Sequence, residues 1–168
     1  IDDAVKRILK LKFELDLFEN PVTNYEEYED FGSKKHHQLE YKAASESITL
    51  LKNNNDILPL KGKPKILVTG PNGNNMRTLN GAWSYSWQGE LTDRFAGDFN
   101  TIYEALQNNY GRNNVKYVSG VSYKENGSYY DMVEDNINAA VREARNSDYI
   151  VLCLGENTYT EKPGDLND

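Results

Sequence analysis

An acidic segment, GENTYTEKPGD, directly follows the apolar run at residues 148–154 and carries Glu156, Glu161 and Asp165. A partly desolvated glutamate can donate a proton near neutral pH, because burial raises its pKa. Glycine and proline in the same segment restrict its backbone, which helps to hold an acid in one place. Glu156 and Glu161 are therefore candidates for acid–base chemistry. Solvated loop charges, with Lys162 as the local counter-charge, are the alternative interpretation.

Three aromatic residues alternate with serines in the segment GAWSYSWQGE, namely Trp83, Tyr85 and Trp87. In an extended segment alternate residues point to the same side, so the pattern predicts that the three rings share one face. Such a face suits sugars, which present apolar C–H surfaces edged by hydroxyl groups. A hydrophobic seam against a neighbouring domain is the alternative.

Other sequence signals argue against further chemistry. The TGPNG turn at residues 69–73 lacks the G-x-G-x-x-G and Walker patterns, which disfavours nucleotide binding. His36 and His37 are adjacent and lack the i, i+4 spacing of a shared metal site, so we expect surface or interdomain hydrogen bonding. Cys153 is the one cysteine, which excludes an internal disulfide and indicates a small buried thiol.

Periodicity predicts the elements that position these residues. Apolar spacing indicates helices at residues 1–18, 36–51, 101–109 and 132–144, and apolar runs indicate strands at residues 63–70, 115–119 and 148–154. Asn20-Pro21 ends the first helix, and the acidic, tyrosine-rich residues 22–35 are typical of a surface linker. Alternating strands and helices predict a parallel α/β sheet with right-handed crossovers. Ligands of such sheets bind beyond the carboxyl ends of the strands, where the segments after Gly70 and Leu154 lie.

Composition excludes several classes of protein. The chain has 168 residues, with 19 Lys and Arg against 26 Asp and Glu, and a net charge of −7 would repel a phosphate backbone. We therefore expect no nucleic-acid partner. No stretch approaches the roughly 20 apolar residues that span a bilayer, so we expect no membrane insertion. Because the pattern of elements is cut at both ends, we expect a piece of a larger protein, with any targeting segment upstream.

Five segments occur in a fixed order along the chain: IDDAVKRILKLKFELDLFENP, ASESITLLKNNNDILPL, KILVTGPNGNN, WSYSWQGE and LGENTYTEKPGD. Taken together they resemble glycoside hydrolase family 3, especially its β-glucosidase and glucan exo-glucosidase members. The resemblance covers nearly the whole chain, and five motifs in the correct order argue against coincidence.

Members of that family resemble a TIM-type barrel joined by a linker to an α/β sandwich, with the active site between the two domains. The resemblance implies that residues 1–18 are the C-terminal helix of the barrel domain. It implies that residues 19–62 are an interdomain linker with one helix, and that residues 63–168 are the N-terminal half of the sandwich domain. The implied fold class is α/β, with a mostly parallel sheet in the sandwich.

The resemblance also implies roles for the candidate residues. Members with a GE-x-x-Y-T-E-x-x-GD loop use its second glutamate as the acid/base, which corresponds to Glu161. Members with a shorter GEG loop use the first, so Glu156 stays the alternative. Trp87 in SWQGE matches an aromatic residue that stacks on the sugar beyond the scissile bond, and Trp83 is a weaker match for a substrate-binding role. The nucleophile is an aspartate of the barrel, upstream of residue 1.

The implied activity is that of a retaining, exo-acting β-glucosidase that removes terminal β-D-glucosyl residues by double displacement. Its ligand would be a β-glucoside or gluco-oligosaccharide, and its protein partner the remainder of the same enzyme, without which the piece is inactive. The mechanism needs no cofactor, and nothing in the sequence encodes a recognisable metal site. The resemblance favours a periplasmic or secreted enzyme; the sugar could also be xylose or N-acetylglucosamine, and a homodimer is compatible. A non-catalytic carbohydrate-binding or scaffold module is the alternative function.

Overall fold

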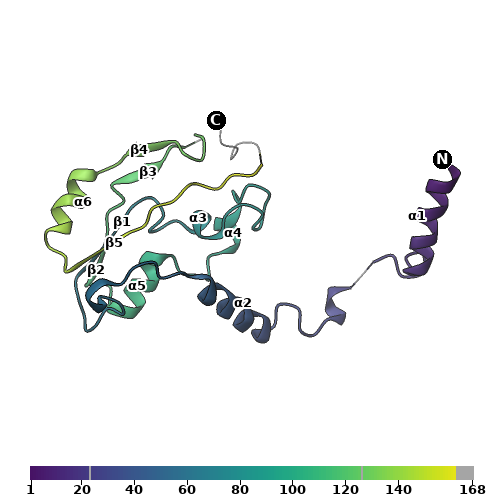
Figure 1. Ribbon diagram of the computed structural model, residues 1–168, viewed down its shortest axis with the longest axis horizontal. Coiled ribbons are helices and arrows are strands. Elements are labelled where there is room, and N and C mark those ends of the chain that lie inside the picture. The colour runs from purple at the N-terminus through teal and green to yellow at the C-terminus, as the bar shows by residue number, and fades with distance from the viewer. Residues whose placement is uncertain (23, 126, 162–168) are drawn as a thin grey trace. The chain divides into compact units, whose positions relative to one another are not determined.

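The computed structural model describes residues 1–22, 24–125 and 127–161, which fall into two compact units, residues 1–55 and residues 56–168 (Figure 1). The portion of the acidic segment from Lys162 to Asp165 lies outside the described residues. No helix within the described ranges is long and apolar enough to cross a membrane.

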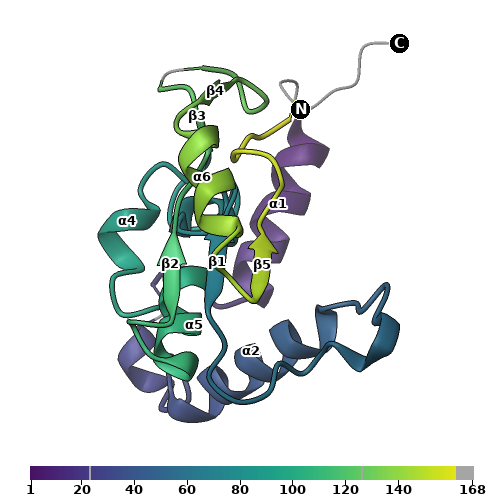
Figure 2. The same ribbon diagram turned by 90° about the vertical axis from the view of Figure 1, so that its left-hand side faces the viewer.

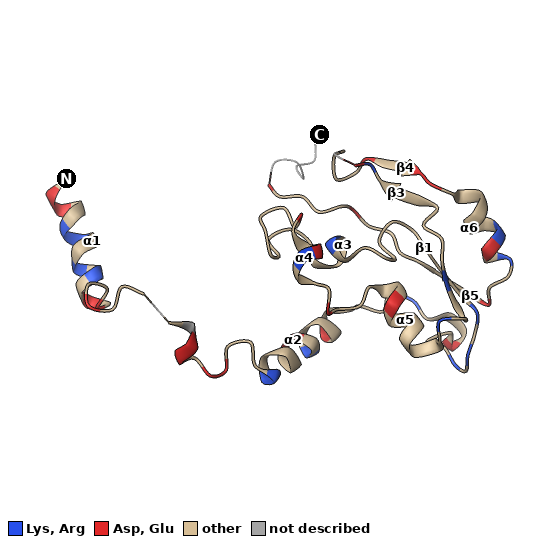
Figure 3. Ribbon diagram, turned by 180° about the vertical axis from the view of Figure 1, so that it is seen from behind, with Lys and Arg blue, Asp and Glu red and all other residues tan. Residues whose placement is uncertain are grey.

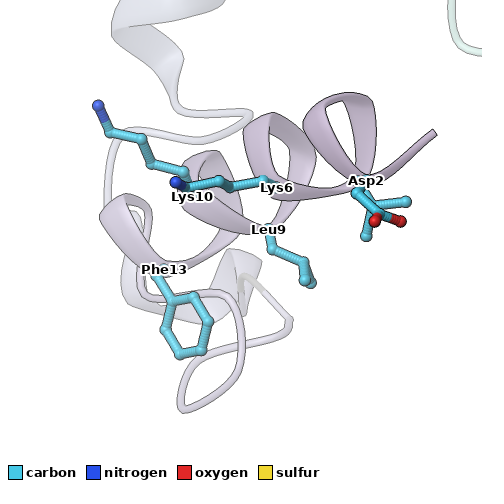
Figure 4. A pocket seen from close by; sticks show the side chains of 6 residues that line it. Asp2, Lys6, Leu9, Lys10 and Phe13 are labelled. Atoms are coloured by element: carbon cyan, nitrogen blue, oxygen red, sulfur yellow. The ribbon is translucent and has the colours of Figure 1, made fainter.

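The first unit begins with helix α1, Asp2–Glu14, which confirms the amphipathic helix predicted for residues 1–18, although it ends earlier. Acidic residues open the helix and basic residues follow, as Figure 3 shows, an order that suits the helix dipole. Leu9 and Phe13 project from one side of α1 (Figure 4). Together with Val5 they form an exposed apolar stripe.

Helix α2, Lys34–Ser47, follows a short 3-10 turn, η1, at Tyr25–Glu27. Ser33 caps α2 by accepting a hydrogen bond from the amide of His36. The prediction of helix to residue 51 is wrong, because Ile48 has an extended backbone. A serine hydroxyl that bonds a nearby carbonyl, as Ser47 does at 2.7 Å, competes with the helix, and the β-branched residues that follow favour extended chain.

Three parallel strands form the larger of the two sheets described in the second unit, in the order β2-β1-β5. After the 3-10 turn η2, Asn54–Asp56, the strands are β1, Ile66–Thr69, β2, Val115–Tyr117, and β5, Tyr149–Leu152. Strand β1 pairs in parallel with both neighbours, which confirms the predicted parallel arrangement. The carboxyl ends of all three strands therefore meet at one edge of the sheet.

Three helices connect β1 to β2: α3, Met76–Asn80, α4, Thr92–Phe95, and α5, Ile102–Tyr110. Only α5 is predicted from the sequence. Its start is fixed by a capping box, in which the Thr101 hydroxyl accepts a bond from the Glu104 amide and the Glu104 carboxylate accepts one from the Thr101 amide.

The prediction of one helix over residues 132–144 is wrong. Strand β3, Val121–Tyr123, pairs with β4, Met132–Glu134, in an antiparallel hairpin, and α6 spans only Ile137–Ala144. The amides of Asp135 and Asn136 both donate to the Gly120 carbonyl, which holds this stretch out of a helical conformation. The Asn136 side chain then caps α6 by accepting a bond from the Ala139 amide.

Helices α5 and α6 lie on different sides of the strands (Figure 1 and Figure 2). Side chains along a strand point alternately to its two faces, which explains this arrangement. Ile66 and Val68 of β1 belong to the buried core beneath α5. Leu67 and Thr69 lie on the other face, toward α6. The buried core cluster consists of Ile66, Val68, Val115 and Cys153, with α5 side chains packed against it. The core thus supports the carboxyl edge of the sheet, where β1 and β5 end.

Candidate active site

The loops that follow β1 and β5 are in contact at the carboxyl edge of the sheet. The amide of Cys153 donates to the carbonyl of Thr69 at 2.8 Å, and the amide of Asn72 donates to the carbonyl of Cys153 at 3.3 Å. Gly70 permits this approach, because a Cβ atom added there would lie 2.2 Å from the Cys153 carbonyl oxygen. The two segments that the sequence places at this edge are therefore joined directly.

The two candidate glutamates lie in the segment after β5, and both side chains are exposed. The Glu156 carboxylate raises the pKa of the Tyr159 phenol, first through side-chain hydrogen bonding and second through its negative charge. Glu161 has a left-handed φ of 54°. Within the part of the chain that the structure describes, its carboxylate has no hydrogen-bond or ion-pair partner.

The turn between β3 and β4 supports the segment that carries the glutamates. The rings of Tyr129 and Tyr159 lie with centroids 4.0 Å apart, and the Asn157 amide donates to the Tyr129 carbonyl at 3.0 Å. At the end of β3, the Tyr123 phenol donates to the side-chain oxygen of Asn72, and burial raises the pKa of Tyr123. The sequence analysis does not identify Tyr123, Tyr129 or Tyr159 as supports of the glutamate segment. Of the three, Tyr159 could have been found from the sequence, because it lies within GENTYTE.

The prediction that Trp83, Tyr85 and Trp87 share the face of an extended segment is wrong. Trp83 and Tyr85 have positive φ values of 63° and 61°, and the Trp83 amide donates to the Trp87 carbonyl at 3.0 Å, so the segment is a closed loop. The two tryptophan rings lie 6.3 Å apart between centroids, whereas Tyr85 stacks on Phe95 at 5.2 Å. Trp83, Tyr85 and Trp87 are 70%, 48% and 53% exposed, so all three rings are open to solvent, but Tyr85 is stacked on Phe95 and only the two tryptophans are paired with each other.

Glu90, the last residue of the WSYSWQGE segment, is an acidic residue to which the sequence analysis assigns no role. Hydrogen bonds from its own backbone amide and from the Ser86 hydroxyl, the latter at 2.9 Å, lower its pKa. Glu90 is therefore held in its carboxylate form and anchors the loop. Among the described residues, no three His, Cys, Asp or Glu side chains are arranged to hold a metal ion.

Arg77 of α3 connects the tryptophan loop with the glutamate segment. Its Nε donates to the Thr158 hydroxyl at 2.6 Å, and its Nη2 donates to the Gln88 carbonyl at 3.4 Å. The Thr158 hydroxyl donates in turn to the same Gln88 carbonyl at 2.7 Å. Because Gln88 follows Trp87, the structure brings the predicted aromatic and acidic segments together. No sequence signal marks Arg77, since a single arginine in a short helix forms no motif.

A parallel sheet whose carboxyl edge carries two joined loops belongs to the class of α/β units that bind ligands at that edge. Residues 48–168 match the family model of the glycosyl hydrolase family 3 C-terminal domain. The chain belongs to glycoside hydrolase family 3, as the five sequence segments imply.

Individual relatives agree with this assignment. The chain is 35% identical to the lysosomal beta glucosidase of Dictyostelium discoideum over 100% of this chain and 21% of that protein. It is 30% identical to a beta-xylosidase of Formosa agariphila over 95% of this chain and 21% of that protein. The crystal structure of an exo-1,3/1,4-beta-glucanase from a Pseudoalteromonas species superposes with a TM-score of 0.58 at 28% identity, over 80% of this chain and 15% of that chain. The chain thus spans about a fifth of the length of the curated relatives it matches.

Proposed function

We propose that the chain is part of a retaining, exo-acting β-glucosidase that hydrolyses terminal β-D-glucosyl residues by double displacement. In this proposal Glu161 is the acid/base, and Trp87, with Trp83 beside it, stacks on the substrate. The observation that carries the proposal is the bridge from Thr158 to Gln88 at 2.7 Å, because it joins the segment of the acid to the loop of the aromatic rings. An acid and a stacking surface at one edge are two of the parts that cleavage of a sugar linkage uses, and the nucleophile is the third.

Glu156 interacts with Tyr159 of its own segment, whereas the Glu161 carboxylate has no partner among the described residues, and this difference supports Glu161 over Glu156 as the acid/base. Glu161 lies further along the segment, directly after the buried Thr160, and its backbone is left-handed. We therefore assign Glu156 to the internal support of the segment and Glu161 to the chemistry.

The reaction would run in two displacements. An aspartate of the barrel attacks C1 of the glucosyl residue while protonated Glu161 donates its proton to the departing oxygen, which breaks the glycosidic bond. Glu161, now ionised, removes a proton from water, and the water oxygen attacks C1 and releases the aspartate. Relatives named as a beta glucosidase and a beta-xylosidase both match this chain, which agrees with sugar selection by residues outside it.

In this proposal the chain contributes to three parts of a larger enzyme. Residues 1–18 are the last helix of the barrel, residues 19–62 the linker, and residues 63–168 the first half of the sandwich. The exposed apolar stripe of Val5, Leu9 and Phe13 on α1 supports the first assignment, because such a stripe needs a covering partner. The separated chain is then inactive, since it lacks the nucleophile.

The stereochemistry of the first product tests the proposed reaction. The complete enzyme is mixed with an aryl β-glucoside, and the anomeric proton signals are followed by NMR before mutarotation. We expect β-glucose to appear first, because two displacements at C1 retain configuration. First appearance of α-glucose would contradict the proposed reaction, and binding of gluco-oligosaccharides without hydrolysis would favour a carbohydrate-binding module.

Substitution of the tryptophans tests the stacking assignment. In the complete enzyme, Trp87→Ala is expected to raise KM for cellobiose about tenfold, because a stacked ring of this kind contributes roughly 1.4 kcal/mol or more. Methyl β-glucoside has no second sugar ring, so its KM should change little. Trp83→Ala is the matched control and should raise KM for cellobiose less than Trp87→Ala does. If Trp87→Ala raised KM equally for cellobiose and for methyl β-glucoside, Trp87 would be removed from this role.

A further inference from the structure

We propose that Arg77 is a positioning residue of this active site, which fixes the Glu161 segment relative to the Trp87 loop. The inference rests on the proposed function, and it assigns a role to a residue that touches neither the acid nor the rings. Its basis is the set of three hydrogen bonds among Arg77, Thr158 and Gln88.

The guanidinium group serves two loops at once. Nε reaches the Thr158 hydroxyl and Nη2 reaches the Gln88 carbonyl, so different nitrogens of one planar group bond to separate segments. Within the described residues, Arg77 has no carboxylate at ion-pair distance, so its side-chain hydrogen bonds go to neutral oxygens of the two loops. A lysine ammonium is a point charge on a flexible stem and lacks this fork geometry.

The short helix α3 holds Arg77 in place. The Asn75 side chain caps the helix by accepting a bond from the Thr78 amide, and the Arg77 carbonyl accepts a bond from the Gly81 amide at 2.9 Å. Gly81 opens the tryptophan loop. A Cβ atom added to Gly89, which lies near the end of that loop, would be 2.5 Å from the Gly81 carbonyl oxygen. The loop is therefore closed at its base, directly after the helix that carries Arg77 (Figure 1).

On the other side, the bonds of Arg77 reach the chain close to Glu161. The Thr158 hydroxyl accepts the Arg77 bond, and the Thr158 amide donates to the side-chain oxygen of the neighbouring Asn157 at 2.9 Å. Thr160 is buried with 4% of its surface exposed, so the chain between Thr158 and Glu161 is pinned at two points. A displacement of Thr158 would therefore also displace Glu161, because the chain between them is held at both points.

General acid catalysis depends on such placement. A displacement of about 1 Å between an acid and the reacting oxygen can cost on the order of 10²-fold in rate. Loss of the Arg77 bonds should therefore weaken proton donation by Glu161 without removing Glu161. It should have little effect on substrates whose leaving group departs without a proton.

The test uses the complete enzyme, with kcat/KM measured for cellobiose and for 2,4-dinitrophenyl β-glucoside. Arg77→Ala is expected to lower the value for cellobiose about 30-fold and that for the dinitrophenyl substrate less than about threefold. Thr158→Val keeps the shape of the side chain but removes the bridging hydroxyl, and it should show the same selective loss even if Arg77→Ala folds poorly. Arg112→Ala, at an exposed arginine on the turn after α5, is the matched control and should leave both values unchanged.

A double substitution separates this inference from the function on which it rests. If Arg77 acts through Glu161, Arg77→Ala should cause no further loss for cellobiose when added to Glu161→Gln. Additive losses, or equal losses on both substrates, would overturn the positioning role while leaving the proposed function intact. If Glu161→Gln alone shows no dependence on the leaving group, the proposed function fails, and the role of Arg77 fails with it.

Discussion

Replacement of Glu161 by glutamine in the complete enzyme is expected to lower kcat/KM for cellobiose by about 10² to 10⁴-fold, the usual contribution of a general acid. Glutamine keeps the size of the side chain but cannot donate a proton to the departing oxygen. The loss should shrink as the leaving group becomes more acidic, so kcat/KM for 2,4-dinitrophenyl β-glucoside should stay within about tenfold of the original enzyme. Azide should restore kcat on that substrate, because it attacks the glycosyl-enzyme intermediate without a general base.

Glu156→Gln is the matched control for this prediction. Both residues lie in the same segment with exposed side chains, but Glu156 interacts with Tyr159 and raises the pKa of its phenol. We expect this variant to lose less than about tenfold on either substrate, through a loosened segment rather than a missing acid. A steep dependence on the leaving group for Glu156→Gln, with none for Glu161→Gln, would exchange the two roles.

Gly70→Ala is expected to destabilise the enzyme by about 3 kcal/mol or more, the largest effect on stability that we predict. Gly70 has a φ of +96°, which side chains rarely adopt, and an added Cβ atom would lie 2.2 Å from the Cys153 carbonyl oxygen. That carbonyl is part of the junction between the β1 and β5 loops, so the clash falls on the backbone and not on a side chain that could move aside. The midpoint of chemical denaturation of the complete enzyme measures the loss.

Gly97→Ala provides the control for that measurement. A Cβ atom at Gly97 would meet no atom within 4 Å, and its φ is not in the left-handed region. This substitution should change stability by less than about 0.5 kcal/mol. A similar, small change for Gly70→Ala would show that the β1 and β5 loops are not as closely joined as the structure has them.

The sequence predicts β1 and β5 because both lie in continuous apolar runs, which are typical of strands in parallel sheets. Strand β1 is buried in the middle of the sheet, whereas Ile150 and Leu152 of β5 are exposed. It does not predict the β3–β4 hairpin. Strand β4 has exposed side chains throughout, so no buried face imposes an alternating pattern on Met132–Glu134. The apolar residues there are also compatible with a helix, and the capping residue Asn136 is the local signal for the true start of α6.

For the candidate site too, the sequence predicts the segments, whereas the contacts between distant residues follow from the fold. The sequence identifies the segments of Glu161 and Trp87, but alternation predicts a shared face only if the backbone is extended. The positive φ values of Trp83 and Tyr85 fold that segment into a loop, which no pattern of residue types specifies. The bonds of Arg77 to Thr158 and Gln88 join positions far apart in the chain, so they follow from the fold and not from any motif.

The most direct test of the proposed mechanism is a crystal structure of the complete enzyme with a thio-linked gluco-disaccharide, which binds but is not hydrolysed. We expect a Glu161 carboxylate oxygen within about 3.5 Å of the bridging sulfur, the contact that proton donation requires. A carboxylate from the barrel should lie about 5 to 5.5 Å from Glu161, with Trp87 stacked on the second sugar. A structure in which Glu156 or a carboxylate from elsewhere contacts the sulfur, while Glu161 faces solvent, would contradict the mechanism.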